Sequence, residues 1–259
     1  MTRFTIITCT YNAQDTLQRT LESVLRQTYE GVEHLIVDGL SPDNSAQMAR
    51  EYANLSAEKT QHIVTVKSEK DRGLYDAMNK GISLATGDYV LFLNAGDVFP
   101  TDNTLSNIAR KIGDVPKEKL PGVLYGDTDI VDDDGHFLRH RRLSPPKKLT
   151  WHSFKHGMLV CHQAFYARTD IAKSTPYNLK YRYSADVDWC IRIMKETEKH
   201  GLTLLNLQQI VANYLDGGLT IKHHRASLRE RFKVMSGHYG ALTAILMHLL
   251  FTVRMAFKK

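Results

Sequence analysis

Polar side chains stand at or near the ends of successive short apolar runs in the first hundred residues. They are Asn12, Asp38, Asp71 and Asp97. A carboxylate in such a place can hold Mg²⁺ or Mn²⁺ against diphosphate oxygens, because these cations need only one or two protein carboxylates. Asp97 suits this task well, since it follows a very apolar run beside the small residues Ala95 and Gly96. A turn or N-cap role is the alternative for Asp97, and turn chemistry is the alternative for Asp38.

Two further acids, Asp186 and Asp188, stand in the segment Tyr183–Arg192, at the predicted start of a helix. A carboxylate placed there could remove the proton from an incoming hydroxyl group, which is the task of a general base. The alternative is that both acids only complement the helix dipole, which stabilises a helix by about 0.3–1 kcal/mol. From the residues alone, both interpretations stay open.

Alternating apolar runs and helical patterns must position these side chains. Strands are predicted at residues 4–8, 35–37, 63–66 and 89–93, with amphipathic helices between them. This alternation is typical of successive βαβ units and of an α/β fold with a mostly parallel central sheet. Because ligands of open α/β sheets bind outside the carboxyl ends of the strands, we expect the polar side chains to meet in one crevice there.

The second half of the chain predicts a mixed sheet and further helices. The expected elements are short strands at 123–127 and 130–131, a hairpin arm at 137–143 after the acidic turn 132–135, and a helix at about 185–200. A basic helical stretch begins at about residue 225 and leads into an apolar segment at 241–257. The chain therefore ends in a predicted helical extension.

Composition limits the class of protein. With 259 residues, 42% hydrophobic and 24% charged, the chain can form one large α/β domain. A net charge of +6 favours anionic partners, but the basic clusters lack interleaved aromatic residues, so no nucleic-acid partner is expected. The start of the chain lacks a signal-peptide pattern, and the three cysteines are widely spaced. We therefore expect a cytoplasmic protein.

Three motifs carry a resemblance to a known family. They are Ser68–Ile82 (SEKDRGLYDAMNKGI), Ala85–Tyr89 (ATGDY) and Phe92–Asp97 (FLNAGD). The runs Ile6–Asn12 and Val37–Gly39 fit the same family. Together they resemble glycosyltransferase family 2 over roughly residues 3–220, and the ordered set is far more specific than any single motif. The chain most resembles the branch that builds capsule, exopolysaccharide of the colanic-acid type and lipid-linked cell-surface glycans.

The resemblance implies a GT-A fold and an inverting sugar transfer from a UDP- or GDP-sugar to a hydroxyl of a glycan or lipid-linked acceptor. Residues 1–100 would form the nucleotide-binding half, 101–220 the acceptor-binding half, and 221–259 a helical tail. The residues implied at the nucleotide sugar are Thr10, Tyr11, Asn12, Asp38, Asp71, Arg72, Asn79, Asn94 and Ala95. Asp97 would be the ligand of Mn²⁺ or Mg²⁺.

The same resemblance implies roles on the acceptor side. Asp186 aligns with the catalytic aspartate of the family, and Asp188 is the second candidate, although Ala185 stands where a glutamate is common. His162, in the segment Cys161–Phe165, would contact the acceptor or a phosphate. The alternative for His162 is a structural role, which is more common for a lone histidine.

Two departures from the family pattern concern the metal. The Asp-x-Asp motif appears as Asn94–Asp97 with only its last acid, and Gly39 replaces an acid that is common beside Asp38. One carboxylate can still hold a cation whose other ligands are phosphate oxygens and water, but we expect a lower metal affinity. The pair His223–His224 could reach the diphosphate or metal from a C-terminal loop, or could simply face solvent.

The apolar segment at 241–257 and the basic residues from 225 predict an interfacial helix that holds the enzyme near a lipid-linked acceptor, at the inner face of the cytoplasmic membrane. The alternative is a helix packed on the domain or in a dimer contact. Because the metal motif is reduced, the alternative function is a catalytically weak homologue that binds nucleotide sugars as a scaffold. A nucleotidyltransferase or epimerase is disfavoured, since the first loop has no Gly-x-Gly-x-x-Gly.

Overall fold

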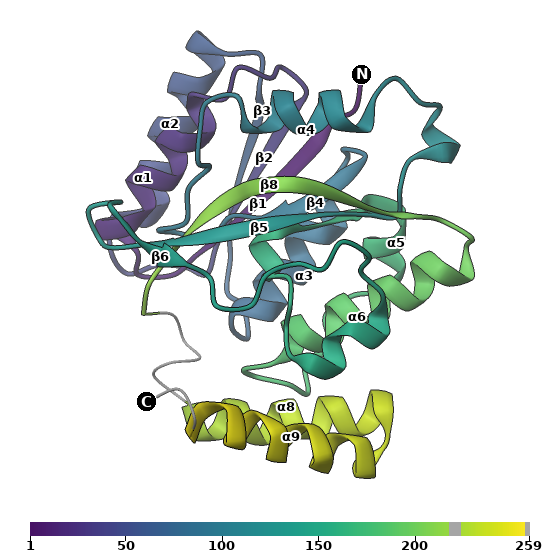
Figure 1. Cartoon of the computed structure of the whole chain (residues 1–259). Helices are drawn as coiled ribbons and strands as arrows, with labels where there is room; N and C mark the ends of the chain where they lie inside the picture. The colour runs from purple at the N-terminus through teal and green to yellow at the C-terminus, as the bar shows by residue number, and fades with distance from the viewer. Residues whose placement is uncertain (218–223, 257–259) are drawn as a thin grey trace.

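The computed structural model describes residues 1–217 and 224–256 and has the expected α/β architecture. A central mixed sheet is flanked by helices, and two further helices lie below it in Figure 1. The strands are β1 (Phe4–Thr10), β2 (Val32–Asp38), β3 (Ile63–Ser68), β4 (Tyr89–Phe92), β5 (Val123–Val131), β6 (Phe137–His140), β7 (Phe165–Arg168) and β8 (Leu204–Leu215). The helices are α1 (Gln14–Leu25), α2 (Ser45–Lys59), α3 (Leu74–Leu84), α4 (Thr104–Ile112), α5 (Thr169–Ser174), α6 (Ala185–Lys199), α8 (His224–Tyr239) and α9 (Ala241–Ala256).

The strand order places the loops after β1 and β4 at the centre of the sheet. The order is β3–β2–β1–β4–β7–β5–β6, and β8 also pairs with β5. β1 is parallel to both β2 and β4, so the chain moves outward from β1 to β3 and then returns to the other side of β1. Such a reversal is a topological switch point, where open α/β sheets bind ligands. β7 then pairs antiparallel with β4 and β5, which makes the sheet mixed.

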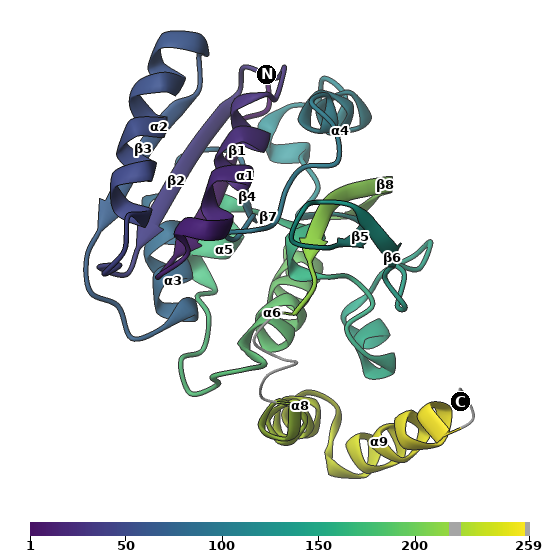
Figure 2. The same ribbon diagram turned by 90° about the vertical axis from the view of Figure 1, so that its left-hand side faces the viewer.

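Both faces of β1, β2 and β4 are buried, whereas β3 at the edge of the sheet is partly exposed. Leu17 and Leu21 of α1 pack with Ile36 of β2 in a cluster that also includes α2. Met78 and Ile82 of α3 belong to the larger core on the other side. α1 and α2 run side by side along the sheet in both Figure 1 and Figure 2. Burial on two faces explains why β1, β2 and β4 are rich in apolar residues, although β1 and β2 also bury polar side chains such as Glu33 and His34.

The second half differs from the expected pattern at β5 and β8, and β7 is a further strand that the sequence does not predict. One continuous strand, β5, replaces the short strands expected at 123–127 and 130–131, because it pairs with β8 along its whole length despite irregular register. The sequence does not predict β8, whose polar residues Asn206, Gln208 and Gln209 obscure the alternating pattern of a strand. The hairpin expected after the acidic turn is present as β5–β6.

α8 and α9 form the helical extension, and Figure 2 shows them below α6. Ala244 and Met247 of α9 are buried in a cluster with Met235 of α8. Over residues 1–217 and 224–256, no helix combines the length and apolar character needed to cross a bilayer. His223 lies outside the described residues, and of His224 only its position as the first residue of α8 is described.

Candidate active site

The carboxyl ends of β1, β2 and β3 place three polar side chains in one row. Thr10 is in register with Asp38, and Asp38 is in register with Ser68. Asp38 is fully buried, and Ser68 Oγ donates a hydrogen bond of 2.6 Å to its Oδ2. Thr10 Oγ1 is also buried but has no hydrogen-bond partner within the described residues. The row therefore offers an unsatisfied hydroxyl beside a fixed carboxylate.

The loop after Asp38 approaches two other predicted site residues. A Cβ on Gly39 would lie 2.6 Å from Asp71 Oδ2 and 3.3 Å from Tyr11 Cδ2. This crowding gives a physical reason for the glycine, because a side chain here would have to displace Asp71. Tyr11 is 66% exposed, so its ring is available for stacking on a planar base. The structure thus brings Tyr11, Gly39 and Asp71 together beside Asp38.

Asn12, Arg72 and Asn79 have different surroundings. Asn12 has a positive φ of 50°, and its backbone amide donates to Ser41 Oγ, which joins the loops after β1 and β2. Arg72 is exposed and forms an ion pair with Asp76 in the first turn of α3. Asn79 Nδ2 donates to the carbonyl of Tyr177, and its Oδ1 accepts from the Tyr177 amide. Asn79 therefore fixes α3 to the segment before α6 with both ends of its amide.

The loop after β4 contains Asn94, Ala95 and Asp97. The Asp97 side chain is buried, with 4% exposure. Gln163 Nε2 donates to Asp97 Oδ2 at 3.0 Å, and the backbone amide of Leu215 donates to Oδ1 at 3.1 Å. Burial raises the pKa of Asp97, and these two hydrogen bonds partly oppose the rise. Asp97 therefore also joins the loop after β4 to the end of β8.

Asp186 is connected with the same loop through His162. Tyr75 donates its hydroxyl to Asp186 Oδ1 at 3.3 Å. His162 Nδ1 lies 3.6 Å from Asp186 Oδ2, and the Asn94 amide nitrogen lies 3.3 Å from His162 Nε2. When Nε2 accepts from Asn94, the neutral ring carries its proton on Nδ1, toward the carboxylate. A row of polar groups therefore runs from α3 to the loop after β4.

A single 3₁₀ turn, His162–Ala164, brings Asp186 and Asp97 to one site. Its first residue faces Asp186 and its second, Gln163, holds Asp97. The Asp186 side chain keeps 17% of its surface exposed. Burial raises the pKa of Asp186, but the imidazole and the Arg231 guanidinium contribute to a stronger opposite effect that lowers it below the ordinary value. Asp186 is therefore ionised at neutral pH and available as a proton acceptor.

Asp188, the second candidate for the base, makes contacts of another kind. Arg192 Nε donates to Asp188 Oδ2 at 2.7 Å, and His238 Nε2 lies 2.9 Å from Oδ1. Burial raises the pKa of Asp188, but the hydrogen bonds with His238 and Arg192 outweigh it and lower the pKa. Asp188 thus pairs with two basic side chains, one of which joins α6 to α8. Among the described residues, Asp186 has no such pair of short contacts and is therefore the better candidate for the base.

Asn94 and Asp97 offer the oxygen atoms that a divalent cation would need. Asn94 Oδ1 is buried and has no hydrogen-bond partner within the described residues. Each carboxylate oxygen of Asp97 accepts one protein hydrogen bond, which leaves lone pairs for another partner. Hard oxygen ligands suit Mg²⁺ and Mn²⁺, so the residues present fit such an ion.

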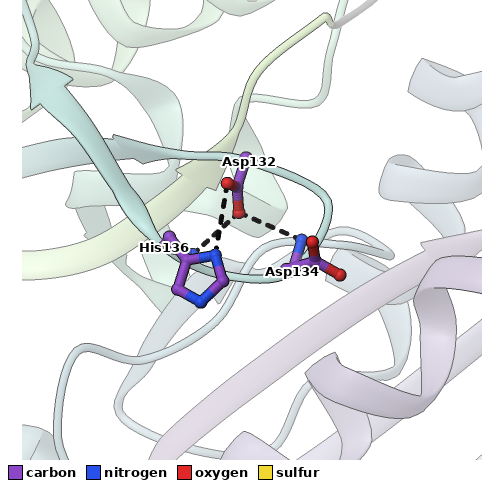
Figure 3. A group of neighbouring side chains, drawn as sticks. All are labelled: Asp132, Asp134 and His136. Carbon is purple, nitrogen blue, oxygen red and sulfur yellow. Dashed lines mark hydrogen bonds and ion pairs between the residues drawn. The ribbon is translucent and has the colours of Figure 1, made fainter.

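A separate acidic group lies in the turn between β5 and β6 (Figure 3). Ligand atoms of Asp132, Asp134 and His136 lie within 4.8 Å of one another. Asp132 Oδ1 accepts from the backbone amides of Asp134 and His136 at 3.0 and 2.8 Å. Asp134 and His136 are exposed, and Arg19 of α1 donates to the carbonyl of Asp132. Local turn chemistry accounts for this spacing.

Tyr75 and Gln163 are the site residues that sequence reasoning missed. Tyr75 contacts Asp186, and Gln163 contacts Asp97. Both belong to segments that carry the family resemblance, which was the signal available. Neither side chain type indicates chemistry by itself, because its role depends on the acid that tertiary structure places beside it.

Comparison with known proteins identifies the family. The model of glycosyl transferase family 2 matches residues 5–174, about two thirds of the chain. The chain belongs to glycosyl transferase family 2. This finding confirms the resemblance drawn from the motifs and identifies the chain as a glycosyltransferase.

Related proteins are glycosyltransferases too. This glycosyltransferase is 34% identical over 223 residues to a PGL/p-HBAD biosynthesis glycosyltransferase of Mycobacterium tuberculosis, over 84% of this chain and 78% of the relative. It is 29% identical over 221 residues to the amylovoran biosynthesis glycosyltransferase AmsB of Erwinia amylovora, over 82% of this chain and 69% of the relative.

Solved structures confirm the expected GT-A fold. TarS 1–349 of Staphylococcus aureus in complex with UDP-GlcNAc matches with a TM-score of 0.68 and 19% identity, over 90% of this chain and 64% of that one. The mannosyltransferase PcManGT of Pyrobaculum calidifontis, in complex with GDP-Man and Mn²⁺, matches with a TM-score of 0.60 and 16% identity, over 97% of this chain and 75% of that one.

Proposed function

We propose that this glycosyltransferase transfers a sugar, with inversion, from a UDP- or GDP-sugar to a hydroxyl of a glycan or lipid-linked acceptor in cell-surface polysaccharide biosynthesis. The observation that carries the proposal is the meeting of Asp97 and Asp186 at one 3₁₀ turn. Two structural neighbours were solved with UDP-GlcNAc and GDP-Man, which supports a nucleotide-sugar donor. The name of AmsB supports a role in polysaccharide biosynthesis.

The loops after β1 and β2 and the segment before α3 would hold the nucleotide. The exposed ring of Tyr11 would stack on the base. Asp71, which lies beside Gly39, and the buried Asp38 would accept hydrogen bonds from the base or ribose. Thr10 would use its unsatisfied hydroxyl in the same contact region. These side chains bind and orient the donor but take no part in bond breaking.

Asp186 would act as the general base. It would accept the proton of the acceptor hydroxyl while that oxygen bonds to the anomeric carbon and the bond from this carbon to the diphosphate oxygen breaks. Attack on the face opposite the diphosphate inverts the configuration. His162 would orient the carboxylate through Nδ1 while Asn94 orients the ring. A Mg²⁺ or Mn²⁺ ion held by Asp97 and Asn94 would neutralise charge on the diphosphate.

We also propose that α9 contacts an anionic membrane surface near the lipid-linked acceptor. Its exposed apolar residues repeat at helical spacing and form what we term the apolar stripe: Leu242, Ile245, Leu246, Leu249 and Leu250, with exposures of 46–72%. Residues 224–256 contain five Lys or Arg residues and one acid. An apolar helix face with excess positive charge suits the headgroup region of an anionic bilayer. Such contact would place the enzyme at the inner face of the cytoplasmic membrane.

A donor screen tests the enzymatic proposal. With Mn²⁺ or Mg²⁺, we expect slow hydrolysis of one donor from a panel of UDP-, GDP- and dTDP-sugars. Asp186→Asn should lower turnover by about 10²–10⁴-fold, because a general base contributes roughly this much. The affinity for the nucleotide should stay within about twofold, since none of the contacts that place Tyr11, Asp38 and Asp71 involves Asp186.

Asp188→Asn is the matched control, because it makes the same change two residues away at the contact between α6 and α8. We expect Asp188→Asn to lower the melting temperature and to lower the turnover number much less than Asp186→Asn does. Nucleotide-sugar binding without turnover of any donor would favour the scaffold alternative. Absence of both binding and hydrolysis would contradict the donor site itself.

A further inference from the structure

One carboxylate of α8 holds the segment that leads into α6. Glu230 Oε2 accepts from the backbone amides of Tyr183 and Ser184 at 2.6 and 3.1 Å, and Oε1 accepts from that of Arg182 at 2.9 Å. Ser184 Oγ also donates to the carbonyl oxygen of Ser227, about one turn earlier in α8. Ser184 and Ser227 are buried, with exposures of 0% and 2%. α8 therefore fixes three consecutive backbone positions before α6.

The fixed segment directly precedes the catalytic candidate. α6 begins at Ala185, and Asp186 lies in its first turn. Ser184, the N-cap residue, makes no side-chain hydrogen bond to the helix start, and Ala185 has no polar side chain. Amides at a helix start lack partners inside the helix, so a carboxylate that accepts from the N-cap amide of Ser184 and from the two amides before it satisfies one of these groups and also complements the dipole. Glu230 supplies that carboxylate from a helix far away in the sequence.

Arg231, the residue after Glu230, also acts on Asp186. Arg231 is one of the cations that act on the Asp186 carboxylate, and its guanidinium Nε is buried without a hydrogen-bond partner within the described residues. Tyr75 also lies within the electrostatic influence of both Glu230 and Asp186. Two consecutive residues of α8 therefore act on the surroundings of Asp186, one through the backbone before α6 and one through charge.

We propose that Glu230 is a positioning residue for Asp186 and that α8 belongs to the catalytic unit, not to a separate tail. The inference rests on the proposed role of Asp186 as the base. Glu230 fixes the backbone at 182–184, and this in turn fixes the direction of the first turn of α6. Asp186 can then face His162 and Tyr75 at once. Misplacement of a reacting group by about 1 Å can cost on the order of 100-fold in rate.

Glu230→Gln tests the inference in the full-length enzyme. The amide replaces one acceptor oxygen by an NH₂ group that would face backbone donors, so the hold on 182–184 weakens. We expect kcat for the hydrolysed donor to fall by roughly 10- to 100-fold. The KM for the donor and the Kd for the free nucleotide should stay within about twofold, because the hydrogen bonds that Glu230 accepts come from residues 182–184 and not from Tyr11, Asp38 or Asp71.

Glu196→Gln is the matched control. It makes the same chemical change toward the other end of α6, where Glu196 pairs with Lys199, and it should leave kcat unchanged. Glu230→Asp retains the charge and should recover part of the lost kcat. Equal kcat in Glu230→Gln and in the wild-type enzyme would overturn the inference, and so would a Glu230→Asp variant no better than Glu230→Gln.

Amide hydrogen exchange separates this inference from the proposed function. In Glu230→Gln, exchange should rise at residues 182–188 and remain at the wild-type level in β1, β2 and β4. This result does not depend on turnover. A wild-type enzyme without turnover but with protected amides at 182–184 would refute the enzymatic proposal alone. Unchanged exchange in Glu230→Gln would refute the contact on which the inference is built.

Discussion

Asp186 has a different neighbour at each carboxylate oxygen, Tyr75 at Oδ1 and His162 at Oδ2. Burial raises the pKa of Asp186, and His162 contributes to the stronger opposite effect that lowers it. A lowered pKa keeps the base ionised toward acidic pH, so loss of the imidazole should raise this pKa. We therefore predict that His162→Asn moves the acid limb of the kcat/KM profile to higher pH. The measurement is a pH–rate profile between about pH 4 and 8.

The matched control for this residue is His200→Asn, which removes a 58% exposed histidine near the end of α6. Its acid limb should coincide with that of the wild-type enzyme. An unshifted acid limb in His162→Asn would contradict the role of the imidazole, and a loss of acceptor affinity without a shift would return His162 to a pure binding role.

At the scale of elements, the apolar stripe of α9 can be tested apart from catalysis. Leu246→Asp together with Leu249→Asp places two charges on exposed positions of the stripe, 53% and 60% exposed, so the fold should tolerate them. Transfer of a leucine side chain out of water contributes about 1.5–3 kcal/mol when burial is complete. We predict at least tenfold weaker binding to phosphatidylglycerol vesicles in a co-sedimentation measurement, with an unchanged melting temperature.

Leu138→Asp is the control for α9, because this leucine is 47% exposed on β6 and lies outside the stripe. It should leave vesicle binding unchanged. If the α9 variant still binds vesicles like the wild-type protein, the membrane proposal is wrong. If the wild-type protein instead forms a dimer that the α9 variant cannot form, the stripe is a contact between copies of the chain.

At the scale of the whole molecule, donor binding should stabilise the fold. Nucleotide at about 100 times its Kd adds roughly 2.7 kcal/mol, or about 5–10 °C for a chain of this size. We predict a larger melting-temperature rise with UDP or GDP plus Mn²⁺ than with the nucleotide alone. Asp97→Asn should remove the metal-dependent part of that rise.

Asp97→Asn should preserve the stability of the free protein. The folded-state pKa of Asp97 is raised, chiefly by burial, so ionisation of this group costs stability as the pH rises above its ordinary value. A neutral side chain of the same size avoids this cost, whereas its NH₂ group gives up one of the two hydrogen bonds that Asp97 accepts, so the two effects oppose each other. The control is the pair Asp132→Asn and Asp134→Asn in the β5–β6 turn, which should keep the metal-dependent rise. Loss of that rise in the control would assign the cation to the turn.

The sequence by itself determined the parts of this protein that depend on local pattern. Apolar runs predict β1 to β4. Tyr11 follows β1 and Asp38 ends β2, because the chemistry lies at strand ends. Asp71, in the loop between β3 and α3, was predicted on the same grounds, and the structure places it beside Gly39. Ordered motifs in these segments were enough to recognise the family and the fold.

Only the tertiary structure decided which protein partners each candidate acid has. Asn79 and Asp188 are predicted site residues. The structure adds that the side chain of Asn79 joins α3 to the segment before α6 and that the side chain of Asp188 joins α6 to α8. The sequence also does not predict β8 or the hydrogen bonds that Glu230 accepts before α6, since each depends on partners distant in the chain. Local periodicity reports burial of a segment, but long-range hydrogen bonds arise only when packing selects their partners.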